Sequence, residues 1–229
     1  MPVRRRPRRP APPRPKKRKA AAAPSRTNDP EKTRQDILDV ATHEFAAKGL
    51  SGARIDEIAE RIRTSKRMIY YYFGSKEALY LAVLEEAYRR IRRIESGLDL
   101  EHLAPLDALA QLVGFTFDYQ TGHPDFIRLV VIENIHEGAH IAHSKVIQDL
   151  NVTAIDALRA LCKRGQAAGV FRDNLDPIDL HMSISALCNF NITNRFTFST
   201  IFKHDMASPR ALATRRAQVV DLIVRYVRR

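Results

Sequence analysis

The chain has 229 residues, of which 45% are hydrophobic and 28% charged, and it contains no Trp. This length allows one or two domains around a mostly aliphatic core. No apolar run approaches the roughly 20 residues that span a bilayer, so a transmembrane protein is excluded. The N-terminus has no apolar segment of the kind found in secretory signals, and the expected compartment is cytoplasmic. With only Cys162 and Cys188, a disulfide scaffold and a zinc finger are excluded as well.

The net charge of +12 is concentrated at one end of the chain. Residues 1–29 hold eleven Lys or Arg and one acidic residue, whereas residues 30–229 hold 27 basic and 25 acidic residues. Residues 1–28 also contain seven of the twelve prolines. We therefore expect a disordered basic arm at 1–28. Its charge favours a polyanionic partner, with DNA preferred over an anionic membrane surface.

From residue 29 onward, apolar residues recur at helical spacing, and no stretch alternates with period two. The predicted class is therefore all-α, without internal repeats. Asp29 before Pro30 is a helix start signal and Gly49 is a stop signal, so they bracket the first helix. Further helices are expected at about 55–62, 66–72, 76–95, 105–120, 124–137, 142–168, 176–201 and 208–228.

Three short helices with a tight turn before the third form a helix-turn-helix pattern. Ser65 can cap the third helix, while Ile69 and Phe73, four residues apart, can face a small core. The side chains then left to face outward are Lys66, Arg67, Tyr70 and Tyr71. Such a helix suits the major groove of DNA, because cations and hydroxyls reach phosphates while the N-terminal turn meets base edges. The alternative, with the tyrosines in the core and a merely solvated charged face, is less favoured beside this turn and the basic arm.

Residues 31–80 resemble the DNA-binding domain of the TetR family of bacterial transcriptional regulators. The resemblance is carried by Ile37-Leu38, Phe45, Gly49-Leu50, Ile58-Ala59-Glu60-Arg61, Ser65, Ile69-Tyr70-Tyr71-Tyr72-Phe73 and Ser75-Lys76-Glu77-Ala78-Leu79-Tyr80. It implies that phosphates are held by Tyr70, Tyr72 and Lys76. It also implies that base edges or thymine methyl groups are met by Lys66, Arg67 and Tyr71.

Two positions depart from the family pattern. The turn reads Ile62-Arg63-Thr64-Ser65, where the family often has Ala-Gly-Val-Ser. A left-handed backbone at Arg63 would cost about 1 kcal/mol. Arg54 stands where the family prefers a hydroxyl residue entering the second helix, and we expect it to replace that hydroxyl with an ionic contact to DNA.

The sequence His136-Glu137-Gly138-Ala139-His140, followed by His143, matches a zinc-protease pattern literally. That chemistry needs both histidines on one continuous helix, and Gly138 interrupts it. No nucleophile triad, phosphate loop or distinctive carboxylate pair stands out. We therefore expect no enzyme, no metal and no cofactor. A histidine-based hydrolase and an effector metal on these histidines remain alternatives.

The C-terminal half more distantly resembles the branch that contains the pyrimidine-utilisation repressor, through His123-Pro124, Arg128-Leu129, Glu133 and Asp176-Pro177. This resemblance implies a small-molecule effector in a cavity among the middle helices, where polar groups fix the ligand. The candidate residues are Phe115, Tyr119, Glu133, Asn134, Ser185, Cys188 and Asn189. Their alternative role is in the core or at an interface.

The last two predicted helices carry more apolar residues than a monomer would hide. These are Leu180, Ile184, Leu187, Ile192, Phe196, Phe198, Leu212, Val219, Val220, Ile223 and Val227. Pairing them with a second subunit gives a four-helix homodimer interface. A dimer also places two reading helices in successive major grooves, about 34–36 Å apart.

The sequence predicts a homodimeric, ligand-responsive regulator of double-stranded DNA, with a repressor favoured. Its expected parts are the arm at 1–28, a helix-turn-helix domain at 29–75 and a helical ligand-binding and dimerisation domain at 76–229. An effector would act by tilting the helix at 76–95. An activator of the same architecture and a weakly selective DNA-compacting protein are the alternatives.

Overall fold

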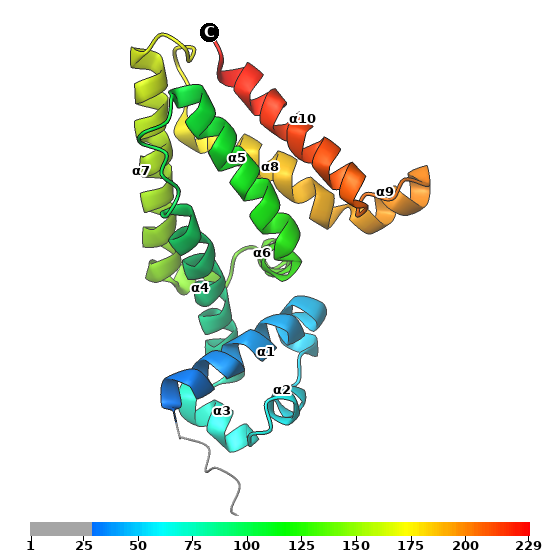
Figure 1. Ribbon diagram of the computed structural model, residues 1–229. Coiled ribbons are helices and arrows are strands. Elements are labelled where there is room, and N and C mark those ends of the chain that lie inside the picture. Colours follow the sequence, from blue (N-terminus) through cyan, green and yellow to red (C-terminus); the bar gives the residue numbers. More distant parts are fainter. Residues whose placement is uncertain (1–28) are drawn as a thin grey trace, which may run out of the picture.

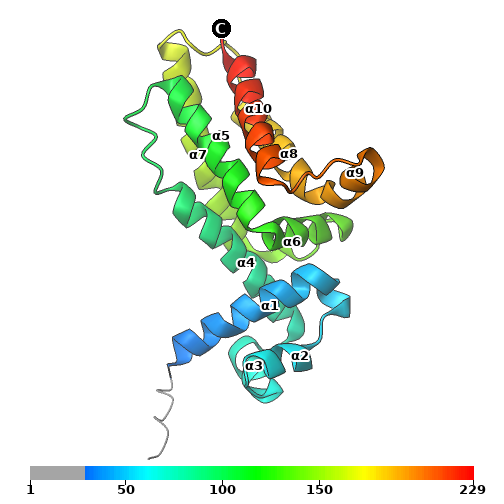
Figure 2. The ribbon, with the colours of Figure 1, turned by 45° about the vertical axis from the view of Figure 1, so that its right-hand side comes forward.

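A computed structural model describes residues 29–229, and the predicted arm at 1–28 lies outside the described residues. The described part confirms the all-α class. Its helices are α1 (Pro30–Gly52), α2 (Ile55–Arg61), α3 (Lys66–Phe73), α4 (Lys76–Glu95), α5 (Pro105–Gly122), α6 (Pro124–Ile135), the 3₁₀ turn η1 (Ile141–His143), α7 (Lys145–Ala167), α8 (Pro177–Thr193), α9 (Arg195–Phe202) and α10 (Pro209–Val227). Helices α1–α3 form a head at one end of the molecule, and α4 connects it to the larger helical body (Figures 1 and 2).

Local signals fix the start and the bend of α1. The Asp29 Oδ1 atom accepts hydrogen bonds from the backbone N–H groups of Glu31 and Lys32, both at 3.1 Å. Pro30 occupies the first helical turn, where its missing N–H costs nothing. Gly49 takes a left-handed backbone, with φ 68°, and interrupts the helix before its last residues. The predicted start signal is thus confirmed, whereas Gly49 kinks α1 three residues before its end at Gly52 instead of ending it.

The described chain has two hydrophobic cores. The first joins α1–α3 to the first half of α4, and Leu129 of α6 and Ile147 of α7 also belong to it. The second is built from α5, α7, α8 and α10. Because α4 begins in the head core and ends beside α7, it links the helix-turn-helix to the body. Among residues 29–229, no helix combines the length and apolarity needed to cross a membrane.

Two predicted helix boundaries were wrong. The helix expected over 176–201 is divided at Asn194, where ψ is 0°. Local side-chain hydrogen bonds there compete with the helix: the Asn194 amide donates to the Thr193 hydroxyl at 2.8 Å. The helix expected over 124–137 ends at Ile135, because Glu137 and Gly138 both take positive φ values.

Five of the eleven residues predicted to form the dimer interface are buried inside the same chain, so their apolar side chains need no second subunit to cover them. Those buried against the second core include Leu180, Ile184, Val219, Ile223 and Val227. Helical periodicity marks an apolar face but cannot say whether its partner is the same chain or another. The large apolar side chains that remain exposed on α8, α9 and α10 are Ile178, Met182, Phe196, Phe198, Ile201, Phe202, Leu222 and Tyr226.

Candidate functional site

The turn between α2 and α3 has the geometry of a helix-turn-helix. The Thr64 N–H donates to the Ala59 carbonyl at 2.9 Å and closes the turn. Arg63 has φ 53°, so this non-glycine position takes the left-handed backbone whose cost was considered above. Ser65 then caps α3, since its hydroxyl oxygen accepts from the Met68 N–H at 3.2 Å.

The two faces of α3 are divided as the sequence predicts. Ile69 is 1% exposed in the head core, and Phe73 packs against the same core. The outward side chains Lys66, Arg67, Tyr70 and Tyr71 are all exposed, and Tyr71 most of all, at 78%. Tyr72 is half-buried and lies edge-on against Tyr71, with ring centroids 5.4 Å apart. The side chains predicted to meet DNA are therefore accessible on the outer face of α3, apart from the half-buried Tyr72.

The cations around α3 are only lightly held. The Lys66 ammonium lies 3.1 Å from the Asp56 carboxylate, and both side chains are about half exposed. A surface pair of this kind contributes about 0–1 kcal/mol, so a phosphate can replace Asp56. Lys76, beyond the end of α3, donates to the Ser51 carbonyl at 3.4 Å. The predicted contacts of both lysines with DNA phosphates stay predictions.

Arg54 begins α2 without capping it through its side chain. Its backbone N–H donates to the buried Glu44 carboxylate at 3.2 Å, and its guanidinium, 4.0 Å from Glu57, is mostly exposed. The side chain thus does not replace a capping hydroxyl. Its predicted contact with a DNA phosphate stays a prediction.

The histidine motif does not lie on one helix. Because α6 ends at Ile135, His136 follows the helix end, and Glu137 and Gly138 form a left-handed break. His140 and His143 belong to the turn that follows. Within residues 29–229 no group of three or more His, Cys, Asp or Glu side chains is arranged to hold a metal ion.

Glu133, one of the predicted effector residues, instead joins the head to the body. Its carboxylate is 1% exposed and accepts from the Tyr80 hydroxyl at 2.9 Å and from the Ile141 N–H at 3.1 Å. It also accepts from the His140 N–H at 3.2 Å and lies 2.9 Å from the His140 ring Nδ1. Tyr80 in turn packs edge-on against Phe45 of α1, with ring centroids 5.1 Å apart. The carboxylate is therefore the centre of a buried network that ties α4 to α6.

The pKa values follow from this network. Burial alone would raise the pKa of Glu133, but hydrogen bonds from Ile141, Tyr80 and His140 outweigh burial and hold that pKa below its ordinary value. Burial, reinforced by the bond to Glu133, raises the pKa of Tyr80. At neutral pH the network thus consists of the Glu133 carboxylate and the neutral Tyr80 phenol. Hydrogen bonds to an ionised acceptor are stronger than those to a neutral one, so the charge of Glu133 stabilises the network.

The other predicted effector residues do not gather at one site. Phe115 and Tyr119 are adjacent on α5, and Tyr119 stacks on His123 with centroids 4.1 Å apart. Asn134 is exposed and donates to its own helix, at the Val130 carbonyl. Burial raises the pKa of Cys188 to about 12, so its thiol stays protonated. The last two, Ser185 and Asn189, are half-buried on α8.

A cavity of about 710 Å³ lies between α4 and α7 and is also lined by Leu98, Leu100 and Glu101 and by Leu112 of α5. None of the seven predicted effector residues lines it. Nor do they line the two smaller hollows, one between α1, α6 and α8–α9 and one among α8, α9 and α10. The size of the α4–α7 cavity is in the range of pockets that hold small organic molecules. Its charged lining residues are Arg89, Arg92, Arg93, Glu95, Glu101 and Arg164.

The sequence could have pointed to this cavity. Arg89, Arg90, Arg92 and Arg93 form a basic run near the end of the predicted helix 76–95. Arg92 is mostly buried, with 11% of its side chain exposed, and it pairs with Glu95 three residues later. Its Nη2 also donates to Asn151 of α7 at 2.8 Å. The run of arginines was the signal available in the sequence. Which of them is buried could not be predicted, because the burial of Arg92 depends on contacts with α7, and its partner Asn151 is 59 residues away.

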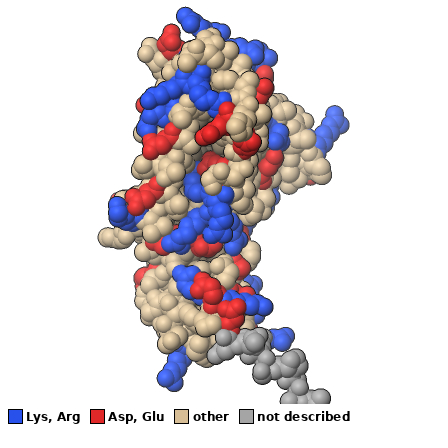
Figure 3. Space-filling model, turned by 60° about the vertical axis from the view of Figure 1, so that its left-hand side comes forward, with Lys and Arg blue, Asp and Glu red and all other residues tan. Residues whose placement is uncertain are grey.

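On the face turned forward in Figure 3, Lys and Arg side chains gather in separate groups, with Asp and Glu side chains between them. This mixture agrees with the nearly balanced charge of residues 30–229. The face therefore lacks the uniform positive charge that binds DNA regardless of sequence.

Comparison with known proteins decides the family. Residues 37–83 match the model described as bacterial regulatory proteins, tetR family, and residues 105–223 match the tetracyclin repressor-like C-terminal domain. The repressor NicS of Pseudomonas putida is 37% identical over 204 residues, which cover 89% of this chain and 96% of NicS. The chain belongs to the TetR family.

Two further regulators extend the comparison. The regulator RutR of Escherichia coli K12 is 34% identical over 143 residues, covering 62% of this chain and 64% of RutR. The crystal structure of the regulator SCO4942 of Streptomyces coelicolor aligns with a TM-score of 0.64 and 29% identity, covering 85% of this chain and 98% of that one. The family resemblance drawn from the sequence is thus confirmed. This TetR-family chain is a regulator with an N-terminal helix-turn-helix and a C-terminal helical domain.

Proposed function

We propose that the chain is a homodimeric transcriptional repressor that binds an operator through α3 and leaves it when a small molecule occupies the α4–α7 cavity. The exposed outer face of α3 is the observation that carries this proposal. A capped eight-residue helix with two cations and a fully presented tyrosine is built for base edges and phosphates together. The name of the relative NicS supports a repressor over an activator.

Within the proposed interface, Lys66, Arg67 and Tyr71 read base edges. Phosphates on either side are held by Arg54, Tyr70, Tyr72 and Lys76, with the Ser65 cap presenting the helix start. Phosphate contacts fix the position of the head, and base contacts supply the selectivity. No chemical step occurs on the DNA, so the head needs neither a metal nor a cofactor.

The dimer forms, in this proposal, through the outer faces of α8 and α10. Ile178 and Met182 lie one turn apart on α8, and Leu222 and Tyr226 lie one turn apart on α10, and all four are exposed. These two helices pack together in the chain. A second copy brought against them by a two-fold axis would form a four-helix interface and cover this apolar strip.

Signalling between cavity and operator would use α4. This helix starts directly after α3 and carries Arg92 into the cavity wall 16 residues later, about 24 Å along its axis. A ligand that prefers one tilt of α4 changes the spacing of the two heads. The Glu133 network would set the resting tilt, because it holds Tyr80 of α4 against α6.

Footprinting of genomic DNA with the purified protein tests the proposal. We expect a palindromic site whose half-sites are one helical turn, about 34–36 Å, apart or a multiple of that. Protection spread evenly over bulk DNA, with no preferred site, would favour the DNA-compacting alternative instead.

A further inference from the structure

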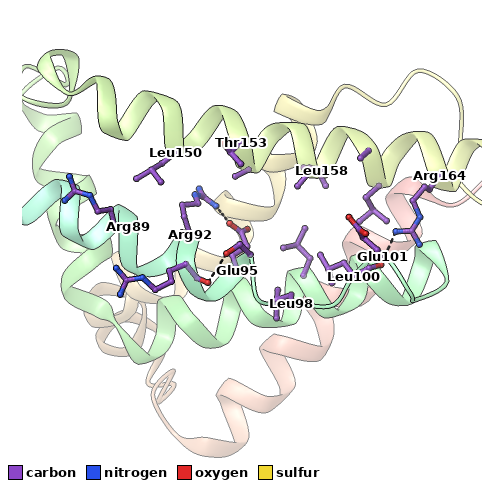
Figure 4. Close-up of a pocket in the computed structure, with 17 residues that line it drawn as sticks. Arg89, Arg92, Glu95, Leu98, Leu100, Glu101, Leu150, Thr153, Leu158 and Arg164 are labelled. Carbon is purple, nitrogen blue, oxygen red and sulfur yellow. Dashed lines mark hydrogen bonds and ion pairs between the residues drawn. The ribbon is translucent and has the colours of Figure 1, made fainter.

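The α4–α7 cavity, the effector site of the proposed function, has a lining that selects a ligand by charge. Figure 4 shows Arg92 and Glu95 toward one end, Arg164 at the other, and leucines between them. The lining contains four arginines and two glutamates, so it is net positive. Apart from these charged residues and from Ser96 and Thr153, the lining is apolar, and it includes Leu98, Leu100, Leu150, Leu158 and Leu161.

The cavity is elongated. Its α7 wall runs from Leu150 to Arg164, which is about 21 Å along the helix axis. Ala154, Ala157 and Ala160 line that wall, and their small side chains leave space along α7 for a ligand. Burial of an apolar ligand against α7 would contribute a favourable free energy of about 25 cal/mol per Å² of apolar surface removed from water. The shape therefore fits a linear apolar chain better than a compact polar molecule.

Arg92 has hydrogen-bonding capacity that the protein leaves unused. Its Nη1 binds Glu95 and its Nη2 binds Asn151, but its buried Nε–H has no acceptor within the described residues. A buried donor without a partner is costly, and a carboxylate can accept from two N–H groups of one guanidinium at once. Arg164 differs, because its guanidinium already donates to the carbonyls of Leu100 and Leu103, at 3.0 and 2.6 Å. Arg89 pairs with Glu85 at 2.8 Å, and Arg93 is exposed. Of the four lining arginines, Arg92 is thus the one with a buried donor that lacks an acceptor in the described residues.

Glu95 occupies the position that a ligand carboxylate would take. It is the last residue of α4, and its carboxylate forms an ion pair with Arg92. An incoming carboxylate shares or displaces Glu95, and the end of α4 then loses its own side-chain tie. Exchange of one carboxylate for another thus links occupancy of the cavity to the helix that carries the reading head.

Resting on the proposed function, we propose that the effector is a linear, amphipathic carboxylic acid: its carboxylate binds Arg92 in competition with Glu95, and its apolar chain lies along α7 between Leu150 and Leu161. The acid binds as its anion and is not chemically altered.

The test uses three probes with the same ten-carbon chain: decanoate, 1-decanol and decylamine, each below the concentration at which it aggregates. Binding is followed by isothermal titration calorimetry, and release is followed by polarisation of a labelled operator found by footprinting. We expect decanoate to bind and to release the operator, 1-decanol to bind at least about tenfold more weakly, and decylamine not to bind. Equal binding of the alcohol or the amine, or no binding of decanoate, overturns the inference.

Two substitutions should move the affinity for decanoate in opposite directions. Arg92→Gln removes the anchor and weakens binding about tenfold or more, whereas Glu95→Gln removes the competitor and strengthens it. Arg159→Gln is the matched control, since Arg159 lies on the exposed side of α7, pairs with Asp156 and does not line the cavity. A merely structural role for the Arg92–Glu95 pair would weaken binding in both variants, and that result overturns the inference.

Failure of the inference and failure of the proposed function are distinguishable. If the wild-type chain selects a palindromic operator while decanoate neither binds nor releases it, the inference is wrong and the proposed function stands. If decanoate binds with the expected dependence on Arg92 and Glu95 but no operator is selected, the ligand site is supported and the repressor function is wrong.

Discussion

The outer face of α3 and the wall of the α4–α7 cavity are both cationic, but their charges are held differently. Lys66 on α3 is about half exposed and rests on an equally exposed Asp56. Arg92 in the cavity is nearly buried between Glu95 and Asn151. Loosely held surface cations exchange readily with a polyanion and respond strongly to salt. A buried guanidinium with fixed partners instead discriminates among small anions, because every replacement partner must match its geometry.

The network at Glu133 ties α4, the helix that runs between these two regions, to α6, and its removal should have the largest effect on stability. Glu133→Ala leaves the Tyr80 hydroxyl and the Ile141 and His140 N–H groups without their buried acceptor. We expect the free energy of unfolding to fall by about 2–5 kcal/mol. Urea denaturation measures this, with Glu60→Ala on the exposed side of α2 as control, expected within about 0.5 kcal/mol of wild type. A loss under 1 kcal/mol would show that the network does not hold head and body together.

In the helical body, stability depends on close packing at the C-terminal end of α7. Gly165 lies against the buried ring of Phe171, and a Cβ atom there would meet the ring carbons at 2.3 Å. Gly165→Ala should therefore cost about 1–3 kcal/mol, because a fully buried ring cannot move aside. Thermal unfolding of this variant beside Gly122→Ala, where a Cβ meets nothing within 4 Å, checks the expectation. Equal melting temperatures would contradict it.

The head side contains strain that a substitution should relieve. Arg63 holds φ 53° in the turn before α3, a conformation that glycine adopts without a steric penalty. Arg63→Gly should raise the free energy of unfolding by about 1 kcal/mol. Chemical denaturation gives the sign directly, and a decrease would mean that the Arg63 side chain contributes more than its backbone costs.

The smallest expected effect is an acid sensitivity near Arg92. Burial, and then the positive charge of Arg92, lowers the pKa of His181 on α8 below its usual 6.5. Below about pH 6.5 the unfolded chain therefore takes up this proton first, so stability falls as the pH is lowered toward the folded-state pKa. His181→Gln should lose less stability than wild type when melting temperatures are compared at pH 7 and pH 5.5. An identical loss in both proteins would argue against the burial of a neutral imidazole.

The head was predictable from the sequence because its decisive contacts are local. Ser65 caps α3 by accepting a hydrogen bond from Met68, three residues later. Arg63 takes the left-handed backbone in the turn before α3. Ile69 faces the core because of helical spacing. Each of these depends on residues within one or two turns of the chain. The outward face of α3 follows from the same spacing, since the side chains opposite Ile69 have no core to enter.

The body was predictable as helices but not as a site. Glu133 stood out as a polar residue in an apolar helix, yet its partners Tyr80 and Ile141 come from other elements, so the sequence could not distinguish a pocket residue from a buried network. Arg92 was missed for the same reason: its burial depends on α7. Leu180 and Val219 illustrate the corresponding error for the dimer, because an apolar face is equally well covered from within the chain.

The most direct test of the proposed interface is operator selectivity of the double variant Lys66→Ala, Tyr71→Ala. Both side chains are exposed, so folding and dimerisation should be unchanged, as melting temperature and sedimentation can verify. Affinity for the footprinted operator and for random duplex of equal length is then compared at one salt concentration. We predict that the wild type prefers its operator by about a thousandfold or more, and that the double variant binds both duplexes equally. A double variant that still prefers the operator as strongly as the wild type would contradict the assignment of α3 as the reading helix.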